Sequence, residues 1–370
     1  MRSGKLCSIT LAINKGQISP IPKMFSTMNF PNYIILIFIL HYFPFLQYLP
    51  HSQGLHFNNI TDQEALISFK FSTSDPHGAL SSWLPNTSFC FWHGVLCNPI
   101  KRRVTGLQLG SHSLAGPISP HLTNLSFLRH LDLQSNNFSG TIPMKIHRIF
   151  RLRFLDLSSN SLHGAIPQSL SRCSQLRTIN LYDNKLHGTI PSELGTLSEL
   201  QNLNLGQNNL SGPIPSSFGN LSSLEQLNLI TNNLEGPIPL ELARLNRLWY
   251  LQLGDNKISG SFPTHLMNIS SLNSFSLTKN QISGKFPSNL FTVLSNLSIA
   301  FFGGNQFTGS IPESLSNAST VEKLDLSTNQ FSGEIPSLWK LQMIQYLNLE
   351  INYLTSEGKE GLNFITSLTN

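Results

Sequence analysis

The 370-residue chain is poor in charge, since Asp, Glu, Lys and Arg make up only 12% of its residues, about half of the usual share. The first 54 residues contain no Asp or Glu, although they carry four of the 24 Lys and Arg residues. The remainder holds 20 basic against 19 acidic residues, so the basic isoelectric point belongs mostly to this leader. Because nucleic-acid binding needs a concentrated basic face, we expect no nucleic-acid partner.

Long apolar runs are almost absent, and the one that stands out is Ile-Ile-Leu-Ile-Phe-Ile-Leu at residues 34–40. Basic residues precede this run and the small residues Ser52-Gln53-Gly54 follow it, which is the layout of a secretory signal peptide. A membrane anchor is the alternative, but a span needs about 20 apolar residues and His41 and Pro44 interrupt the run. We therefore predict a leader with a signal peptide over residues 1–54 and entry into the secretory pathway.

Cysteine is scarce, with four residues in the chain, of which Cys7 belongs to the leader. Secretion permits disulfides. We predict that Cys90 bonds to Cys97, which follows after six intervening residues, and that Cys173 is a buried free thiol. A metal site with His93 as a third ligand is the alternative, but the spacing fits no common zinc pattern, so we predict no metal.

Signatures of catalysis are missing as well. Ser, Asp and His are scattered over variable positions, and neither a Gly-x-Ser-x-Gly turn nor the Gly-rich loop and catalytic motifs of a kinase occur. His163 and His187 share a phase in neighbouring repeats, and we expect solvated histidines on the convex side rather than metal ligands. The sequence thus predicts no catalytic residue and no cofactor.

The chain has instead a repeat of about 24 residues. Gly lies four residues after each of nine regularly spaced asparagines, and an Ile-Pro or Phe-Pro pair follows each of these glycines. With a tenth, the recurring asparagines are Asn136, Asn160, Asn184, Asn208, Asn232, Asn256, Asn280, Asn305, Asn329 and Asn352. Such a period predicts a solenoid in which each coil is completed by its neighbour.

The spacing inside a unit predicts how each coil is built. Apolar residues two positions apart, such as Ile179 and Leu181, point to the same side of a short strand. Stacked strands pair into a parallel sheet, and their apolar sides merge into one core. The recurring Asn ends the strand and turns inward, where the backbone of adjacent coils must satisfy its amide. We predict ten complete units over residues 104–343 and an eleventh, partial unit from Ile344.

The repeat unit resembles the plant-specific leucine-rich repeat, as in Leu176-Arg-Thr-Ile179-Asn-Leu181-Tyr-Asp-Asn184-Lys-Leu186-His-Gly188-Thr-Ile190-Pro191. The resemblance covers roughly residues 59–370 and implies an α/β leucine-rich repeat solenoid with a curved parallel sheet on its concave face. The segment Asn59–Cys97 resembles the plant N-terminal cap, here assigned to residues 55–103 and closed by the disulfide. Repeats then occupy residues 104–370.

The resemblance extends to the ectodomains of plant leucine-rich repeat receptor-like kinases. The tail at residues 350–370 is similar to an irregular repeat of the immune-receptor subfamily with the flagellin-sensing and elongation-factor-sensing receptors. This implies a peptide or protein ligand, and a co-receptor kinase contacted through later repeats that the chain lacks. It also implies a place outside the plasma membrane or in the apoplast, with any membrane link through a segment absent from this chain. We interpret the chain as part of a longer receptor; a secreted inhibitor or decoy similar to the polygalacturonase-inhibiting proteins is the alternative.

Three departures from the repeat pattern carry expectations of their own. Repeat one has His112 in place of Asn and Ile118-Ser119 in place of Ile-Pro, which we interpret as an adaptation to the cap. Repeat eight has one extra residue near Thr292-Val293, for which we predict a loop bulge. The basic run Lys101-Arg102-Arg103 between cap and repeats is expected to be a solvated junction.

The outward side of the predicted sheet is the candidate ligand-binding surface, because it is rigid, extended and repetitive. Aromatic side chains on it would act as anchors, and amides beside them would pair with a peptide backbone. Trp249 and Tyr250 are the strongest candidates. The predicted ligand-binding residues are Phe154, Tyr182, Ile230, Trp249, Tyr250, Gln252 and Phe301.

Nine Asn-x-Ser/Thr sequons predict N-glycosylation in the secretory pathway. Four of them share one phase on the convex side, where a glycan would not block the concave face. The predicted acceptors are Asn59, Asn86, Asn124, Asn137, Asn209, Asn220, Asn268, Asn296 and Asn317.

Overall fold

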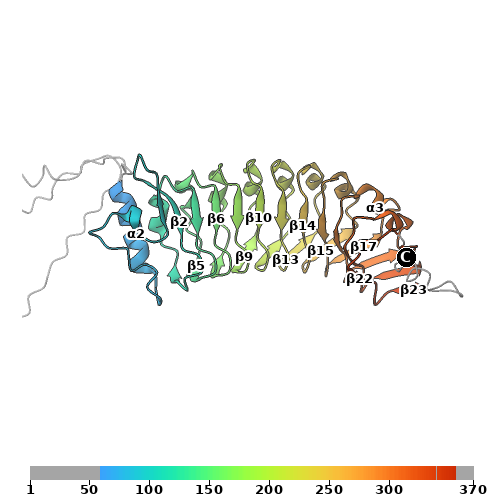
Figure 1. Cartoon of the computed structure of the whole chain (residues 1–370). Helices are drawn as coiled ribbons and strands as arrows, with labels where there is room; N and C mark the ends of the chain where they lie inside the picture. Colours follow the sequence, from blue (N-terminus) through green and yellow to red (C-terminus); the bar gives the residue numbers. More distant parts are fainter. Residues whose placement is uncertain (1–58, 339, 356–370) are drawn as a thin grey trace, which may run out of the picture. The chain divides into compact units, whose positions relative to one another are not determined.

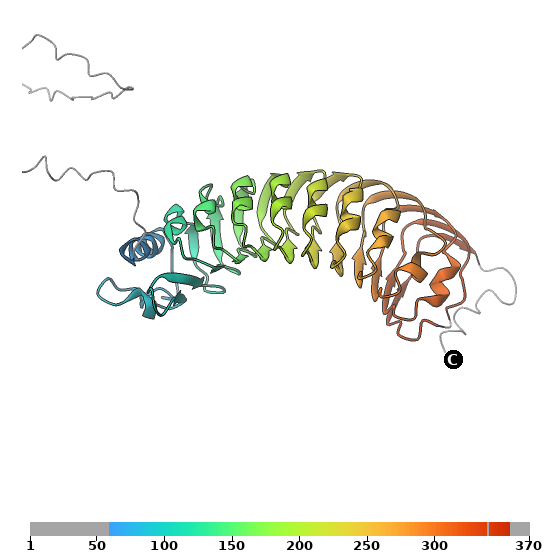
Figure 2. The same ribbon diagram turned by 90° about the horizontal axis from the view of Figure 1, so that it is seen from above.

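The computed structural model describes residues 59–338 and 340–355 as a curved row of stacked coils (Figures 1 and 2). Each coil adds one strand to a first sheet, one strand to a second sheet and, in most coils, a short helix between them. The predicted repeat solenoid is therefore confirmed. The predicted signal peptide of residues 1–54 and the end of the predicted irregular repeat lie outside the described residues.

The first sheet lines the concave face and has 12 strands. β1 pairs with β2 antiparallel, whereas all later neighbours are parallel and in register, as Leu203 is with Ile179 and Leu227. Its strands are β1 (Val95–Cys97), β2 (Val104–Gln108), β4 (His130–Asp132), β6 (Phe154–Asp156), β8 (Thr178–Asn180), β10 (Asn202–Asn204), β12 (Gln226–Asn228), β14 (Tyr250–Gln252), β16 (Ser274–Ser276), β18 (Ile299–Phe301), β20 (Lys323–Asp325) and β22 (Tyr346–Asn348).

The second sheet has 11 strands, all parallel, and the sequence did not predict it. The strands from β5 to β21 each begin just after the recurring Asn and contain the recurring Gly, whose φ is positive, as at Gly188 (φ 82). The two terminal strands differ, because β3 follows His112 instead of Asn and β23 contains no Gly. Its strands are β3 (Ala115–Pro117), β5 (Asn137–Gly140), β7 (Ser161–Gly164), β9 (Lys185–Thr189), β11 (Asn209–Gly212), β13 (Asn233–Gly236), β15 (Lys257–Ser261), β17 (Gln281–Lys285), β19 (Gln306–Gly309), β21 (Gln330–Glu334) and β23 (Tyr353–Thr355). The exposed His163 and His187 lie on β7 and β9, so they belong to this sheet and not to the convex side.

Short helices form the convex side opposite the first sheet (Figure 2). Most are 3-10 helices that begin after the Pro of the Ile-Pro pair, which fixes φ at the helix start. They are η2 (Pro120–Asn124), η3 (Ile146–Ile149), η4 (Gln168–Arg172), η5 (Ser192–Thr196), η6 (Ser216–Asn220), η7 (Leu240–Arg244), η8 (Thr264–Asn268) and η9 (Glu313–Asn317). The loop bulge predicted near Thr292-Val293 is wrong: the extra residue is absorbed by a one-turn α-helix, α3 (Leu290–Val293), in place of the 3-10 turn.

The recurring asparagines form the predicted ladder of buried amides. Asn208 Nδ2 donates to the carbonyl of Leu181 in the preceding coil at 2.9 Å and to that of Leu205 at 3.1 Å. Its Oδ1 accepts the N–H of Leu186 at 3.0 Å. The amide thus satisfies backbone groups that both sheets leave unpaired where the chain turns, and it joins each coil to the one before it.

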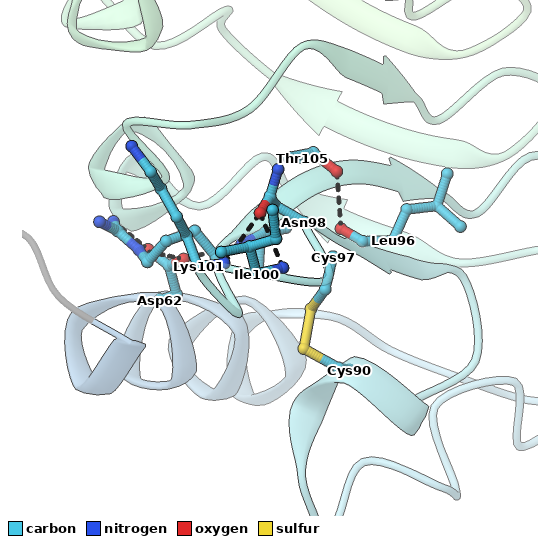
Figure 3. The surroundings of a disulfide bond; sticks show 10 residues. Asp62, Cys90, Leu96, Cys97, Asn98, Ile100, Lys101 and Thr105 are labelled. Carbon is cyan, nitrogen blue, oxygen red and sulfur yellow. Dashed lines mark hydrogen bonds and ion pairs between the residues drawn. A yellow bond between two sulfur atoms is a disulfide. The ribbon is translucent and has the colours of Figure 1, made fainter.

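The N-terminal cap consists of the helix α2 (Asn59–Ser72), the 3-10 helix η1 (Phe89–Phe91) and strand β1. Figure 3 shows the predicted bond between Cys90 and Cys97, which ties η1 to β1, and the Cys173 thiol is free and buried, also as predicted. Burial raises the pKa of the Cys173 thiol to about 12. It is therefore an unreactive core side chain.

The cap docks on the first coil through a buried ion pair, and this corrects the prediction of a solvated Lys101-Arg102-Arg103 run. Lys101 and Arg102 are exposed, but Arg103 is buried and donates to the Asp62 carboxylate on α2 at 2.7 and 2.8 Å. Asp62 also accepts the N–H of Val104 at 2.9 Å. The prediction failed because a basic run suggests solvent, whereas the partner of Arg103 lies 41 residues earlier in the chain.

The unusual first repeat is adapted to the cap, as predicted. His112 takes the phase of the recurring Asn, and its Nε2 lies 2.9 Å from the Nε2 of His93 in the cap. Trp83 and Trp92 stack beneath this junction with ring centroids 5.3 Å apart, and the Trp83 indole donates to the His93 carbonyl. His93 therefore takes part in both contacts of the junction. Its carbonyl accepts from Trp83 within the cap, and its ring lies against His112 of the first repeat.

Candidate functional site

The concave face carries three rows of outward side chains, because alternate residues of each strand point away from the core. The first row comes from the first residue of each three-residue strand and the second row from the third residue. The third row lies two residues further on, where the strand has ended. We call the part of this surface over β8, β10, β12 and β14 the concave strip.

Four amides in register form the second row of the concave strip. Asn180, Asn204, Asn228 and Gln252 are paired across neighbouring strands. The Oδ1 atom of each Asn accepts the backbone N–H two residues later, for example that of Ile230 at 3.1 Å. The amide nitrogens of Asn204 and Asn228 make no hydrogen bond within the part of the chain that the structure describes. The backbone thus orients these two side chains and leaves a row of donors.

Gln252 differs from the other amides, because it is only 8% exposed and donates to the hydroxyl of Ser274 at 3.0 Å. Its amide would have to exchange this bond for one to a ligand. The assignment of Gln252 as a ligand-binding residue stays a prediction. Its side chain exposes less surface than its position in the repeat suggests.

Tyr182 and Ile230 lie on either side of a glycine in the third row. A side chain added at Gly206, on the coil between them, would lie 2.9 Å from Ile230 Cγ2 and 3.1 Å from Tyr182 Cδ2. The two half-buried side chains therefore both reach into the space that this glycine leaves. The role of Gly206 was not predicted from the sequence. The available signal was that Gly206 occupies the same phase as the bulky Tyr182 and Ile230 of the neighbouring repeats.

Tyr250, in the first row, and Trp249, just before β14 at the edge of the sheet, close the other end of the concave strip. Their rings make an edge contact with centroids 5.6 Å apart, and the Trp249 side chain is 38% exposed. Burial raises the pKa of the Tyr250 phenol, and the Tyr182 phenol raises it further. Burial and the Asp183 carboxylate likewise raise the pKa of Tyr182. Both phenols therefore remain protonated at neutral pH and can donate a hydrogen bond to a ligand.

The remaining predicted aromatics lie outside the concave strip. Phe154 stacks on His130 with ring centroids 4.2 Å apart and planes 2° from parallel, which makes a flat platform on β4 and β6. Phe301 lies near Tyr346, with centroids 6.2 Å apart, at the other end of the sheet. The structure thus brings together Tyr182, Ile230, Trp249 and Tyr250 and separates Phe154 and Phe301 from them. His130 was not predicted, although it precedes Phe154 by one repeat.

The predicted glycosylation sites lie off the first sheet. Asn124, Asn220, Asn268 and Asn317 each end a convex 3-10 helix, as their shared phase suggested. Asn124 is half-buried, whereas the other eight acceptors are exposed. Glycans at these positions would leave the concave strip open.

No three His, Cys, Asp or Glu side chains in residues 59–338 and 340–355 lie where they would hold a metal ion together. In the same residues, no helix combines the length and the apolar character needed to cross a bilayer.

Two family models match the chain. One describes a leucine-rich repeat region and matches residues 111–366, and the other describes a leucine rich repeat N-terminal domain and matches residues 59–98. Neither describes a catalytic domain.

The chain is similar to plant receptor kinases in sequence and structure. It is 46% identical over 79 residues to the LRR receptor-like serine/threonine-protein kinase EFR of Arabidopsis thaliana, an alignment that covers 21% of this chain and 8% of that protein. The solved complex of PEPR1 with AtPEP1 matches with a TM-score of 0.76 and 33% identity, over 83% of this chain and 44% of that one. The Arabidopsis receptor kinase HAESA, solved with the peptide hormone IDA and the co-receptor SERK1, matches with a TM-score of 0.73 and 35% identity, over 80% of this chain and 50% of that one. The matched region is thus at most about half of these proteins.

Proposed function

Because the chain belongs to the leucine-rich repeat family, we propose that its concave strip binds an extended peptide outside the cell, as the sensing region of a plant receptor kinase in defence or signalling. The observation that carries this proposal is the continuity of the concave strip. Tyr182, Ile230, Trp249 and Tyr250 line one surface with a row of oriented amides between them. No enclosed pocket is needed for such a ligand, since an extended chain spreads its contacts over several coils.

Two physical features of the concave strip and two solved relatives support a peptide as the ligand. Exposed aromatic rings give large contact area at a low cost in side-chain entropy. The amide nitrogens of Asn204 and Asn228 can donate to peptide carbonyls, and the phenols of Tyr182 and Tyr250 add two further donors. Solved relatives bind the peptides AtPEP1 and IDA. A co-receptor is a second expected partner, since HAESA was solved with both the peptide hormone IDA and the co-receptor SERK1.

The test is a binding comparison on the glycosylated protein. An array of synthetic peptides is probed first with the wild-type chain, and the peptides retained are titrated against Trp249→Ala combined with Tyr250→Ala. A central aromatic anchor contributes about 2 kcal/mol or more, so the double variant should weaken binding at least about 30-fold. Its thermal midpoint should stay nearly unchanged, because Trp249 is partly exposed.

A matched control removes two exposed aromatics from the cap, Phe71→Ala with Phe91→Ala, which are 85% and 87% exposed. This variant should bind like the wild type. Equal affinity of the Trp249/Tyr250 variant and the wild type for every retained peptide would rule out the concave strip as the binding surface.

A further inference from the structure

The two halves of the repeat region carry opposite charge, which the near-neutral total conceals. Residues 101–190 hold 11 Lys and Arg against three Asp, whereas residues 191–355 hold seven Lys and Arg against 11 Asp and Glu. The positive half thus has a concentrated source of attraction for anions, and its arrangement decides what it can bind.

Three exposed arginines of the positive half form a row along the edge of the concave sheet. Each lies immediately before a strand of that sheet. The N–H of Arg153 donates to the carbonyl of Arg129 and the N–H of Arg177 to that of Arg153, both at 2.8 Å. We call Arg129, Arg153 and Arg177 the arginine row. Because backbone hydrogen bonds join them, they are spaced at about 4.8 Å, one strand spacing.

The intramolecular partners of the arginine row are weak. Arg177 lies 3.5 Å from Glu199, and the two side chains are 51% and 58% exposed, so solvent screens the pair. Arg153 Nε donates to Gln175 at 3.4 Å. Either guanidinium can therefore turn to a carboxylate of a ligand and form a bidentate pair.

The three carboxylates of the positive half do not neutralise the arginine row. Asp156 is buried and accepts from the Ser158 hydroxyl at 2.6 Å and from Asn180 Nδ2 at 2.8 Å. Asp132 accepts the N–H of Gln134 at 3.1 Å. Asp183 follows its strand, whereas the arginines precede theirs. These carboxylates repel an anion that lies over the middle of the strands. An anion is therefore bound more favourably along the edge of the sheet where the arginines lie.

The arginine row leads directly into the concave strip. The same backbone hydrogen bonds continue from Arg177 through Gln201 and Glu225 to Trp249, which occupies the identical phase. Trp249 is three coils from Arg177 and five from Arg129, or about 14 and 24 Å. An extended peptide rises about 3.3 Å per residue, so these spans correspond to about four and seven residues.

We propose that the arginine row binds an acidic segment of the peptide ligand, about four to seven residues from the residue that contacts Trp249. This inference rests on the proposed function, because it adds an acidic segment to the peptide that is proposed to bind the concave strip. Glu225, which lies one coil before Trp249 at the same phase, repels an acidic residue at the anchor itself. The row therefore sets the direction of the peptide, with its acidic segment towards the cap.

Binding of a fluorescein-labelled octaglutamate peptide, followed by anisotropy, tests the arginine row by itself. The wild-type protein should bind the probe at about 10 mM ionic strength and lose most of that affinity at about 150 mM, where the Debye length falls from about 30 to about 8 Å. The variant Arg129→Gln/Arg153→Gln/Arg177→Gln should weaken binding about tenfold. The matched control Arg244→Gln/Arg247→Gln/Lys257→Gln removes the same charge from the other half and should change the affinity less than about twofold.

Two outcomes would overturn the proposal. Equal losses in the two triple variants would mean that net charge, and not the arginine row, attracts the probe. Tight binding of a polyuronate, lost on removing the arginine row, with no binding of octaglutamate would identify a polysaccharide surface instead of a peptide surface. The octaglutamate probe has no aromatic anchor, so a failure here leaves the Trp249/Tyr250 test of the proposed function unaffected.

Discussion

The coils next to the N-terminal cap and the coils around Phe262–Phe331 share one backbone pattern but differ in what fills and covers their cores. At the N-terminal end a separate cap covers the first coil with stacked tryptophans and the buried pair of Asp62 and Arg103. Towards the other end the core changes composition, and Phe262, Phe286, Phe302, Phe307 and Phe331 contact one another with centroids 4.8 to 6.2 Å apart. The comparison shows that the amide ladder sets the backbone of each coil. The size of the core side chains and the charge of the surface differ between coils that share this backbone.

The largest expected effect is at the cap. Arg103→Ala leaves the Asp62 carboxylate buried without its cation, which should cost about 3–5 kcal/mol in the free energy of unfolding of the cap and first coils. Hydrogen exchange resolved by segment measures this, because stacked coils need not unfold together. Arg177→Gln, which removes an exposed pair, should cost less than about 1 kcal/mol. A loss confined to the last coils would contradict the assigned role of Arg103.

A reciprocal exchange between a leucine-rich coil and the phenylalanine cluster tests the difference in their cores. Leu205 and Phe302 occupy the same phase and are both fully buried. Leu205→Phe should overpack the leucine core around β10 and Phe302→Leu should leave a cavity in the phenylalanine cluster, each costing about 1–3 kcal/mol by urea unfolding. A neutral result for Leu205→Phe would show that the core around β10 has room that the structure does not indicate.

The parts that the period encodes directly could be predicted from the sequence. Inward leucines and the recurring Asn fixed the first sheet, because each concave strand keeps its central residue in the core. The second sheet was missed because each of its strands buries about one side chain, such as Leu210 in Asn209–Gly212, which gives no alternating pattern. The ion pair of Arg103 needed a contact distant in sequence.

The candidate site was predicted as a set of residues but not as an arrangement. The phase of Tyr182, Trp249 and Tyr250 was enough to place them on or beside the concave face. It could not show that Tyr182 and Ile230 both reach into the space left by Gly206, or that Gln252 is held by Ser274, since both facts depend on side-chain packing between coils. The arginines of the arginine row recur with the period of the repeat. The nearly neutral charge of residues 55–370 conceals them, because the acidic residues that balance them lie elsewhere in the chain.

The smallest expected effect is a pH dependence present in both halves. Burial lowers the pKa of His130 below 6.5, against the opposing influence of Asp132 and Asp156, and burial also lowers the pKa of His265. A histidine with a lowered folded pKa binds its proton more readily in the unfolded chain. Its contribution to stability is therefore complete above about pH 6.5 and is lost as the pH falls through the folded pKa.

Stability to urea should accordingly decrease modestly between pH 7 and pH 5, and the substitutions separate the two halves. His130→Gln should remove the pH dependence of hydrogen exchange in the coils of β4 and β6, and His265→Gln that of the coils around η8. His163→Gln, at an exposed position on β7, is the control and should leave both unchanged. Hydrogen exchange in the first coils that slows as the pH falls, after correction for the intrinsic rate, would contradict this prediction. It would mean that His130 is charged in the folded protein. A cation would then lie beside Phe154, at the end of the sheet where the arginine row begins.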